Sequence, residues 1–195
     1  MTIDLLFPRP VFESIDEEDT CNRTALREAC LRIVGKPAAQ DAAPDPYYRV
    51  ASSRADNDQL HHAEPFAALA DYINACSEVF LEALGFPGSK GKITQMWANV
   101  GSGGDFVYPH NHRDEGFVSG DYVVSCDPRD GMSFHNDSDR QAPVELNPLN
   151  YPNFYYQGQE GRLLMYRSET AHSTFPQQGD ERIVISFNIQ IRPAK

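Results

Sequence analysis

The second half of the sequence is a succession of short segments that favour β-strands, and this feature limits the fold more than any other. From Lys92 onward, stretches rich in β-branched and aromatic residues alternate with turns rich in Gly, Pro, Asn and Asp. The predicted strands cover residues 93–100, 106–112, 117–125, 132–134, 162–167 and 182–191. Because no helical segments separate them, they favour an antiparallel sandwich or jelly roll over a parallel α/β sheet.

The first part of the chain predicts helices. Residues 22–34 carry apolar side chains at helical spacing, and residues 64–86 do so more strongly, with Pro65 near the start and Gly85 near the end. We therefore expect a mainly β protein with N-terminal helices and a double-stranded β-helix core, the jelly roll that cupins also have. The expected organisation is one domain over residues 1–195. Residues 1–91 would supply a helical buttress and an N-terminal strand, and residues 92–195 the catalytic jelly roll.

Charge and composition limit the partners of the chain. A formal net charge of -11 argues against binding nucleic acid, because that binding needs a basic surface. No apolar run approaches the roughly 18 residues of a membrane span, and the N-terminus lacks the basic region of a secretion signal. We expect a cytoplasmic protein that binds a small-molecule substrate and neither nucleic acid nor membrane; a homodimer is left open. The four cysteines form no C-x-x-C pair, so neither disulfides nor a cysteine metal site is predicted.

Two closely spaced histidines and a distant third predict a metal site. His110 and His112 are two residues apart, so in an extended strand both side chains point to the same face. Asp114 joins that face if the strand continues, which leaves two overlapping readings, His110-x-His112 and His112-x-Asp114. His172 follows a buried-looking strand sixty residues later. Two near ligands and one distant ligand suit a facial triad on a jelly roll.

The last predicted strand brings a cation toward the same place. At a period of two, Arg182, Val184, Ser186 and Asn188 share one face of this strand. If that face lines the barrel, the Arg182 guanidinium is buried and needs a partner, and its planar fork matches a carboxylate. The simplest partner is the distal carboxylate of a dicarboxylic keto acid that chelates the metal.

Six short motifs run along the chain in a fixed order. They are F-P-R-P, W-A-N, H-N-H, S-G-D-Y, G-R-L leading to Y-R-S and H, and R-I-V-I-S-F-N, at residues 7–10, 97–99, 110–112, 119–122, 161–172 and 182–188. This series resembles the 2-oxoglutarate and iron(II)-dependent oxygenase superfamily, most of all its small bacterial and phage branch. Asp121 stands where that branch commonly has an apolar residue, Tyr166 where its pattern has Phe, and Arg167 where it usually has proline.

The resemblance implies a role for individual residues. His110, His112 and His172 match the iron ligands of the branch, while the wider superfamily has a carboxylate in second position, so Asp114 stays open as the alternative. Arg182 matches the anchor of the distal carboxylate of 2-oxoglutarate, and Asn99 matches a position that often hydrogen-bonds the same cosubstrate. Ser186 is expected to assist Arg182, although the more familiar pattern of the superfamily is Arg-x-Ser and the spacing here differs. The implied activity is hydroxylation of an unactivated C–H bond with iron(II), 2-oxoglutarate and O2, releasing succinate and CO2.

Two other functions remain open from the sequence. Residues 104–120 also resemble a cupin motif, in which Glu115 would be a metal ligand of a dioxygenase or isomerase that does not use 2-oxoglutarate. A metal-binding or ligand-binding module without catalysis is the second. Substrate selection is expected in the loops at residues 113–118 and 127–152. The aromatic cluster at residues 151 and 154–156 is interpreted as a plug for the barrel end or as a pocket wall, and His135 as an exposed loop residue.

Overall fold

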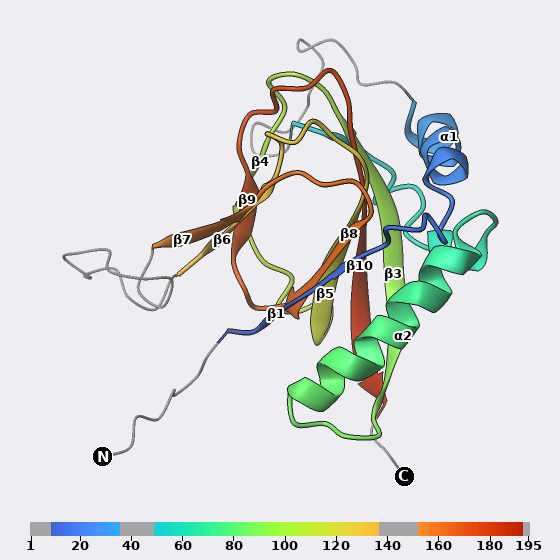
Figure 1. Ribbon diagram of the computed structural model, residues 1–195, viewed down its shortest axis with the longest axis vertical. Helices are drawn as coiled ribbons and strands as arrows, with labels where there is room; N and C mark the ends of the chain where they lie inside the picture. The colour runs from blue at the N-terminus through green and yellow to red at the C-terminus, as the bar shows by residue number, and fades with distance from the viewer. Residues whose placement is uncertain (1–8, 36–48, 137–151, 193–195) are drawn as a thin grey trace.

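The computed structural model describes residues 9–35, 49–136 and 152–192, which form two helices, a short 3-10 turn and ten strands (Figure 1). In chain order these are β1 (Val11–Ile15), α1 (Arg23–Val34), β2 (Ala51–Ser52), η2 (Leu60–His62), α2 (Ala67–Ala83), β3 (Lys90–Gly101), β4 (Val107–His110), β5 (Val118–Ser125), β6 (Met132–His135), β7 (Asn153–Tyr156), β8 (Arg162–Arg167), β9 (His172–Thr174) and β10 (Arg182–Arg192).

The strands form two sheets that face each other. The larger sheet has the order β1-β8-β5-β10-β3-β2 and the smaller one the order β4-β9-β6-β7, and all pairs within them are antiparallel. In Figure 1 both helices lie beside the larger sheet, on the side away from the smaller one. This arrangement confirms the predicted fold class, a double-stranded β-helix with N-terminal helices.

Strand β10 shows why the helices cover one face and the site lies on the other. Ile183, Ile185 and Phe187 belong to the hydrophobic core that the helices share with the larger sheet. Burying each such side chain contributes about 1.5–3 kcal/mol, which fixes the register of the strand. The alternating residues Arg182 and Ser186 must then point between the sheets, as the sequence predicted.

Several elements differ from the sequence-based expectation. The strand expected over residues 106–112 ends at His110, because the chain turns immediately after it. The second helix begins at Ala67, since Pro65 lies in the preceding turn. Strands β2 and β9 are too short to give a periodic signal. The aromatic cluster forms strand β7.

Some expectations fall outside the described residues. These are the first two residues of the F-P-R-P motif, Tyr151, and the central part of the loop at residues 127–152. Within the described part, all four cysteines are free, as expected. No helix in that part is long and apolar enough to cross a membrane.

Candidate metal and keto-acid site

A pocket lies between the two sheets and takes its walls from both. The larger sheet contributes polar residues from β3, β5 and β10, and the smaller sheet contributes residues from β4, β6 and β9. The lining includes Trp97, Asn99, Gly101, Val107, His110, His112, Asp121, Met132, His172, Gln177, Arg182, Val184 and Ser186. The three predicted histidines and the predicted arginine therefore share one pocket.

The three histidines come together at this pocket. His110 ends β4 and lies directly across from His172, the first residue of β9. His112 follows in the turn after β4, where its backbone N–H donates to the carbonyl of Ser168 at 2.8 Å. One ligand atom from each ring lies within 4.8 Å of those of the other two rings, a spacing that suits one metal ion.

Hydrogen bonds orient each ring. Nδ1 of His110 lies 2.9 Å from the carbonyl of Tyr108, and Nδ1 of His172 lies 3.0 Å from the carbonyl of Thr170. A carbonyl only accepts, so both Nδ1 atoms carry the proton and Nε2 keeps a lone pair. Nδ1 of His112 is engaged in the same way, 2.8 Å from Oε2 of Glu115. All three rings thus offer Nε2 as the ligand atom.

The environment keeps the imidazoles of His110 and His172 neutral, which is the form that binds metal. Burial lowers the pKa of His172 well below its usual value, and the neighbouring His110 lowers it further. Burial also lowers the pKa of His110. Both rings are therefore unprotonated near neutral pH.

The structure does not bring Asp114 to the histidines. Its side chain is exposed in the turn, and it is not part of the three-histidine group. The reading in which Asp114 joined the ligand face required the strand to continue, and β4 ends four residues earlier at His110. The reading His112-x-Asp114 is thus not supported by this backbone.

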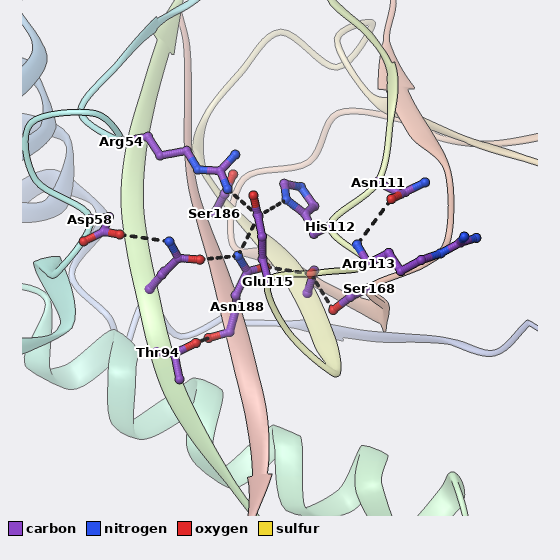
Figure 2. Close-up of polar contacts among 12 residues, drawn as sticks. Arg54, Asp58, Thr94, Asn111, His112, Arg113, Glu115, Ser168, Ser186 and Asn188 are labelled. Carbon is purple, nitrogen blue, oxygen red and sulfur yellow. Dashed lines mark hydrogen bonds and ion pairs between the residues drawn. The ribbon is translucent and has the colours of Figure 1, made fainter.

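Glu115 contacts the histidine cluster through Nδ1 of His112, the ring nitrogen that is not offered to the metal. Figure 2 shows its carboxylate between the Arg54 guanidinium and the His112 ring. Glu115 Oε2 also accepts a hydrogen bond from Nδ2 of Asn188 at 3.2 Å. Burial alone would raise the pKa of Glu115, but the hydrogen bonds from His112 and Arg54 lower it, so Glu115 is a carboxylate.

This carboxylate belongs to a chain of polar side chains across the larger sheet. Asn188 donates to Oε1 of Gln95 at 2.8 Å, and Gln95 donates to Asp58 at 2.9 Å (Figure 2). Arg54 in addition packs over the Trp97 ring, 4.4 Å from its centroid. The position of His112 is thus set by residues from the β2–α2 loop and from strands β3 and β10.

On the side of the pocket formed by β3 and β10, several buried polar atoms make no hydrogen bond to any described residue. Arg182 is buried, and within the described residues its Nε makes no hydrogen bond. The same holds for Oδ1 of Asn99 and Nε1 of Trp97, although Nδ2 of Asn99 donates to Ser186 at 2.9 Å. Unpaired buried polar atoms cost free energy, so their gathering in one pocket indicates a polar ligand there.

The other expected positions lie away from this pocket. His135 ends strand β6 and is half-buried, with Nε2 2.8 Å from the Ser173 hydroxyl, so the expectation of an exposed loop residue is wrong. Phe154 and Tyr155 on β7 are exposed at the surface and do not line the pocket.

Sequence reasoning missed residues that line the pocket or contact its lining. Gln177, in the lining, and Arg54, which packs over Trp97, come from irregular segments that carry no periodic signal. Asp121 was noted only as a departure from an apolar position. A charged residue inside a strand that is otherwise uncharged and almost entirely buried was the available signal for a site residue.

A segment of the sequence and the fold are matched by known proteins. Residues 95–188 match the family model described as "Putative 2OG-Fe(II) oxygenase". Among solved structures, the chain is similar to the non-heme α-ketoglutarate-dependent epimerase SnoN from nogalamycin biosynthesis, with a TM-score of 0.65, 13% identity, and coverage of 94% of this chain and 78% of that chain. A Pseudomonas putida prolyl-4-hydroxylase gives a TM-score of 0.59 at 16% identity, covering 92% of each chain.

A third similar structure was solved with ligands. HygX from Streptomyces hygroscopicus, with nickel, 2-oxoglutarate and hygromycin B bound, gives a TM-score of 0.60 at 13% identity, covering 94% of this chain and 83% of that chain. At these identities the similarities show the fold. Among proteins with curated descriptions, none matches the sequence.

The segment matched by the family model contains the three clustered histidines, Asn99, Arg182 and Ser186. Together with the double-stranded β-helix, this match makes the chain similar to the 2-oxoglutarate and iron(II)-dependent oxygenases.

Proposed function

We propose that the protein hydroxylates an unactivated C–H bond of a small molecule, with iron(II) held by His110, His112 and His172 and with 2-oxoglutarate anchored by Arg182. The observation that carries this proposal is the buried Arg182, whose Nε is unpaired within the described residues, in the same pocket as three imidazoles that present Nε2. The donor set fits both groups, since neutral imidazole suits iron and a guanidinium fork suits a carboxylate.

Each residue has a defined task in this function. The three histidines would hold the metal through Nε2, and such a three-ligand set would leave positions for cosubstrate and oxygen. Arg182 binds the distal carboxylate, while Asn99 and Ser186 donate or accept hydrogen bonds along the chain of the keto acid. Val107, Met132 and Val184 are apolar parts of the wall and exclude water. When bound, iron(II), 2-oxoglutarate and O2 supply the oxidant that converts C–H to C–OH, with release of succinate and CO2.

A small-molecule substrate is supported by the acidic charge of the chain and by similar structures. The net charge of -11 disfavours nucleic acid. HygX was solved with hygromycin B bound, SnoN is an epimerase, and the Pseudomonas putida protein is a prolyl-4-hydroxylase. Hydroxylation is the default among these outcomes, and product analysis distinguishes it from epimerisation.

The direct test is anaerobic titration of the full chain with iron(II) and then 2-oxoglutarate, followed through the weak visible charge-transfer band of the chelate. Wild type should develop the band. Arg182→Ala should lose it at 2-oxoglutarate concentrations that saturate wild type, and Arg182→Lys should recover part of the affinity, because an ammonium supplies charge without the fork. Arg32→Ala, a change at an exposed position on α1, is the matched control. Absence of the band in wild type would overturn the proposal.

Two alternatives predict different outcomes in the same experiments. In a cupin-like enzyme with Glu115 as a ligand, Arg182→Ala has no effect and removal of the Glu115 carboxylate abolishes metal binding. In a non-catalytic module, the band forms but no succinate is released with any small-molecule substrate. The hydrogen bond from Nδ1 of His112 to Glu115 favours an orienting role for that carboxylate over a ligand role.

A further inference from the structure

Asp121 is a buried carboxylate inside the proposed keto-acid pocket. It lies on β5, whose residues from Val118 to Val124 are all buried, and its own exposed fraction is 7%. A charge buried in such a strand is unfavourable unless hydrogen bonds or an opposite charge compensate it. Asp121 faces the space between the sheets and lines the pocket with Ser186 and Arg182.

Two hydroxyl groups hold this carboxylate. Ser186 Oγ donates to Oδ1 at 2.6 Å, and Tyr166 Oη donates to Oδ2 at 2.8 Å. Each oxygen of Asp121 thus accepts a hydrogen bond from a hydroxyl group. Tyr166 Oη also lies 3.1 Å from Nε2 of His172, the atom that faces the metal position. The Tyr166 hydroxyl therefore lies between the Asp121 carboxylate and the nitrogen of His172 that faces the metal position.

The three-histidine site differs in charge from a site with a carboxylate ligand. Three neutral histidines leave the full double charge of iron(II) uncompensated, whereas two histidines and a carboxylate would cancel half of it. The other carboxylate beside the cluster, Glu115, is already balanced by Arg54. Asp130 is near Arg182 as well, but it accepts hydrogen bonds from the backbone N–H groups of Gln178 and Gly179 and does not line the pocket.

We infer that Asp121 is a positioning residue that replaces the missing carboxylate ligand, supplying its negative charge to the metal site through Tyr166. This inference rests on the proposed function. With Asp121 counted, iron(II), Arg182, and a dianionic keto acid leave the loaded pocket formally neutral. The same charge lies along the path from the histidines to Arg182, so it opposes the keto acid while it favours the cation.

The test compares two affinities, because the negative charge of Asp121 should strengthen binding of the metal cation and weaken binding of the 2-oxoglutarate anion. Asp121→Asn keeps the shape and removes the charge. Nickel(II), a stand-in that does not turn over, is titrated calorimetrically without keto acid, and 2-oxoglutarate is then titrated at saturating nickel(II). We expect nickel affinity to fall on the order of tenfold, and 2-oxoglutarate affinity to rise. Asp71→Asn, the same charge change at an exposed site on α2, should alter neither.

A second variant separates the connection from the charge. Tyr166→Phe removes the hydroxyl between Asp121 and His172 and keeps the carboxylate, so nickel affinity should fall while 2-oxoglutarate affinity stays as in wild type. This variant also carries the test if Asp121→Asn does not fold, which circular dichroism and thermal unfolding would show. A purely structural role would weaken both ligands in both variants.

The outcomes separate this inference from the proposed function. If wild type binds neither nickel(II) nor 2-oxoglutarate, the proposed function fails and the inference fails with it. If wild type binds both, but the variants weaken both ligands together or change neither, only the role of Asp121 is overturned. A fall for the cation with no fall for the keto acid supports it.

Discussion

The Glu115 carboxylate accepts the Nδ1–H of His112 at 2.8 Å, and this contact determines which nitrogen of that ring faces the other two histidines. Removing the charge should weaken the metal site without destroying it. We expect Glu115→Gln to lower nickel(II) affinity about tenfold and Glu115→Ala by up to about 100-fold, because carboxylates that orient metal-bound histidines have effects of this size. Calorimetric titration at neutral pH measures both.

The matched control for these variants is Glu82→Gln, which makes the same change at an exposed position on α2. It should bind nickel(II) as wild type does. Complete loss of binding in Glu115→Gln would instead identify Glu115 as a ligand and favour the cupin-like function. Unchanged binding in Glu115→Ala would show that the contact orients nothing.

Metal binding should stabilise the fold, because the three histidines join β4, the turn after it and β9. At a free nickel(II) concentration of 100 times the dissociation constant, we expect the free energy of unfolding to rise by about 2.7 kcal/mol. A chelator should reverse the gain. The measurement is urea unfolding with and without metal.

His172→Ala is the variant that tests whether this stabilisation comes from the proposed site. It removes one of the three ligands and should abolish the metal-dependent part of the stability. An equal gain in wild type and in His172→Ala would locate the metal elsewhere on the chain.

Much of the site could be predicted because its residues lie in regular segments. The inward face of β10 follows from strict alternation over an uninterrupted strand, and Arg182 and Ser186 on that face line the pocket. His110 and His172 lie at a strand end and a strand start, next to segments with a clear β pattern. For these residues, the alternation of side chains along a single strand was enough to predict the face on which they lie.

The remainder depended on contacts between residues far apart in the sequence. Arg54 and Glu115 are 61 positions apart, and Asp121 and Tyr166 are 45 apart. Such pairs are set by strand register and loop path, which local patterns do not determine. Asp114 was offered as a ligand because alternation was extended beyond His110, where the backbone already turns.

Gly120 is required by close packing at the centre of the larger sheet. A Cβ at this position would lie 2.4 Å from Cζ of Phe187 and 2.5 Å from the carbonyl oxygen of Leu164. We expect Gly120→Ala to lower the free energy of unfolding by about 2 kcal/mol or more, since the core and the backbone of β8 must both shift. Gly103→Ala is the control, because its nearest neighbour would be at an ordinary 3.7 Å. Similar urea midpoints for the two variants would contradict this packing.

Asp16 should make stability depend on pH. Its carboxylate accepts hydrogen bonds from the backbone N–H and hydroxyl of Thr20, from the N–H of Cys21 and from the hydroxyl of Tyr122, at 2.7–3.1 Å. Burial alone would raise the pKa of Asp16, but these hydrogen bonds outweigh it and hold the pKa well below its ordinary value of 3.8. They tie the turn after β1 to strand β5.

Because the pKa of Asp16 is depressed in the folded state, its contribution is fully present above the unfolded pKa and is lost as the pH falls below about 4. Asp16→Asn should be less stable than wild type at pH 7 by on the order of 3 kcal/mol, the value of hydrogen bonds to a buried charged group. The gap should narrow in acid, as wild type loses the same contribution. Urea unfolding between about pH 2 and 7 tests this, and parallel stability curves for the two proteins would show that Asp16 carries no such charge-dependent contact.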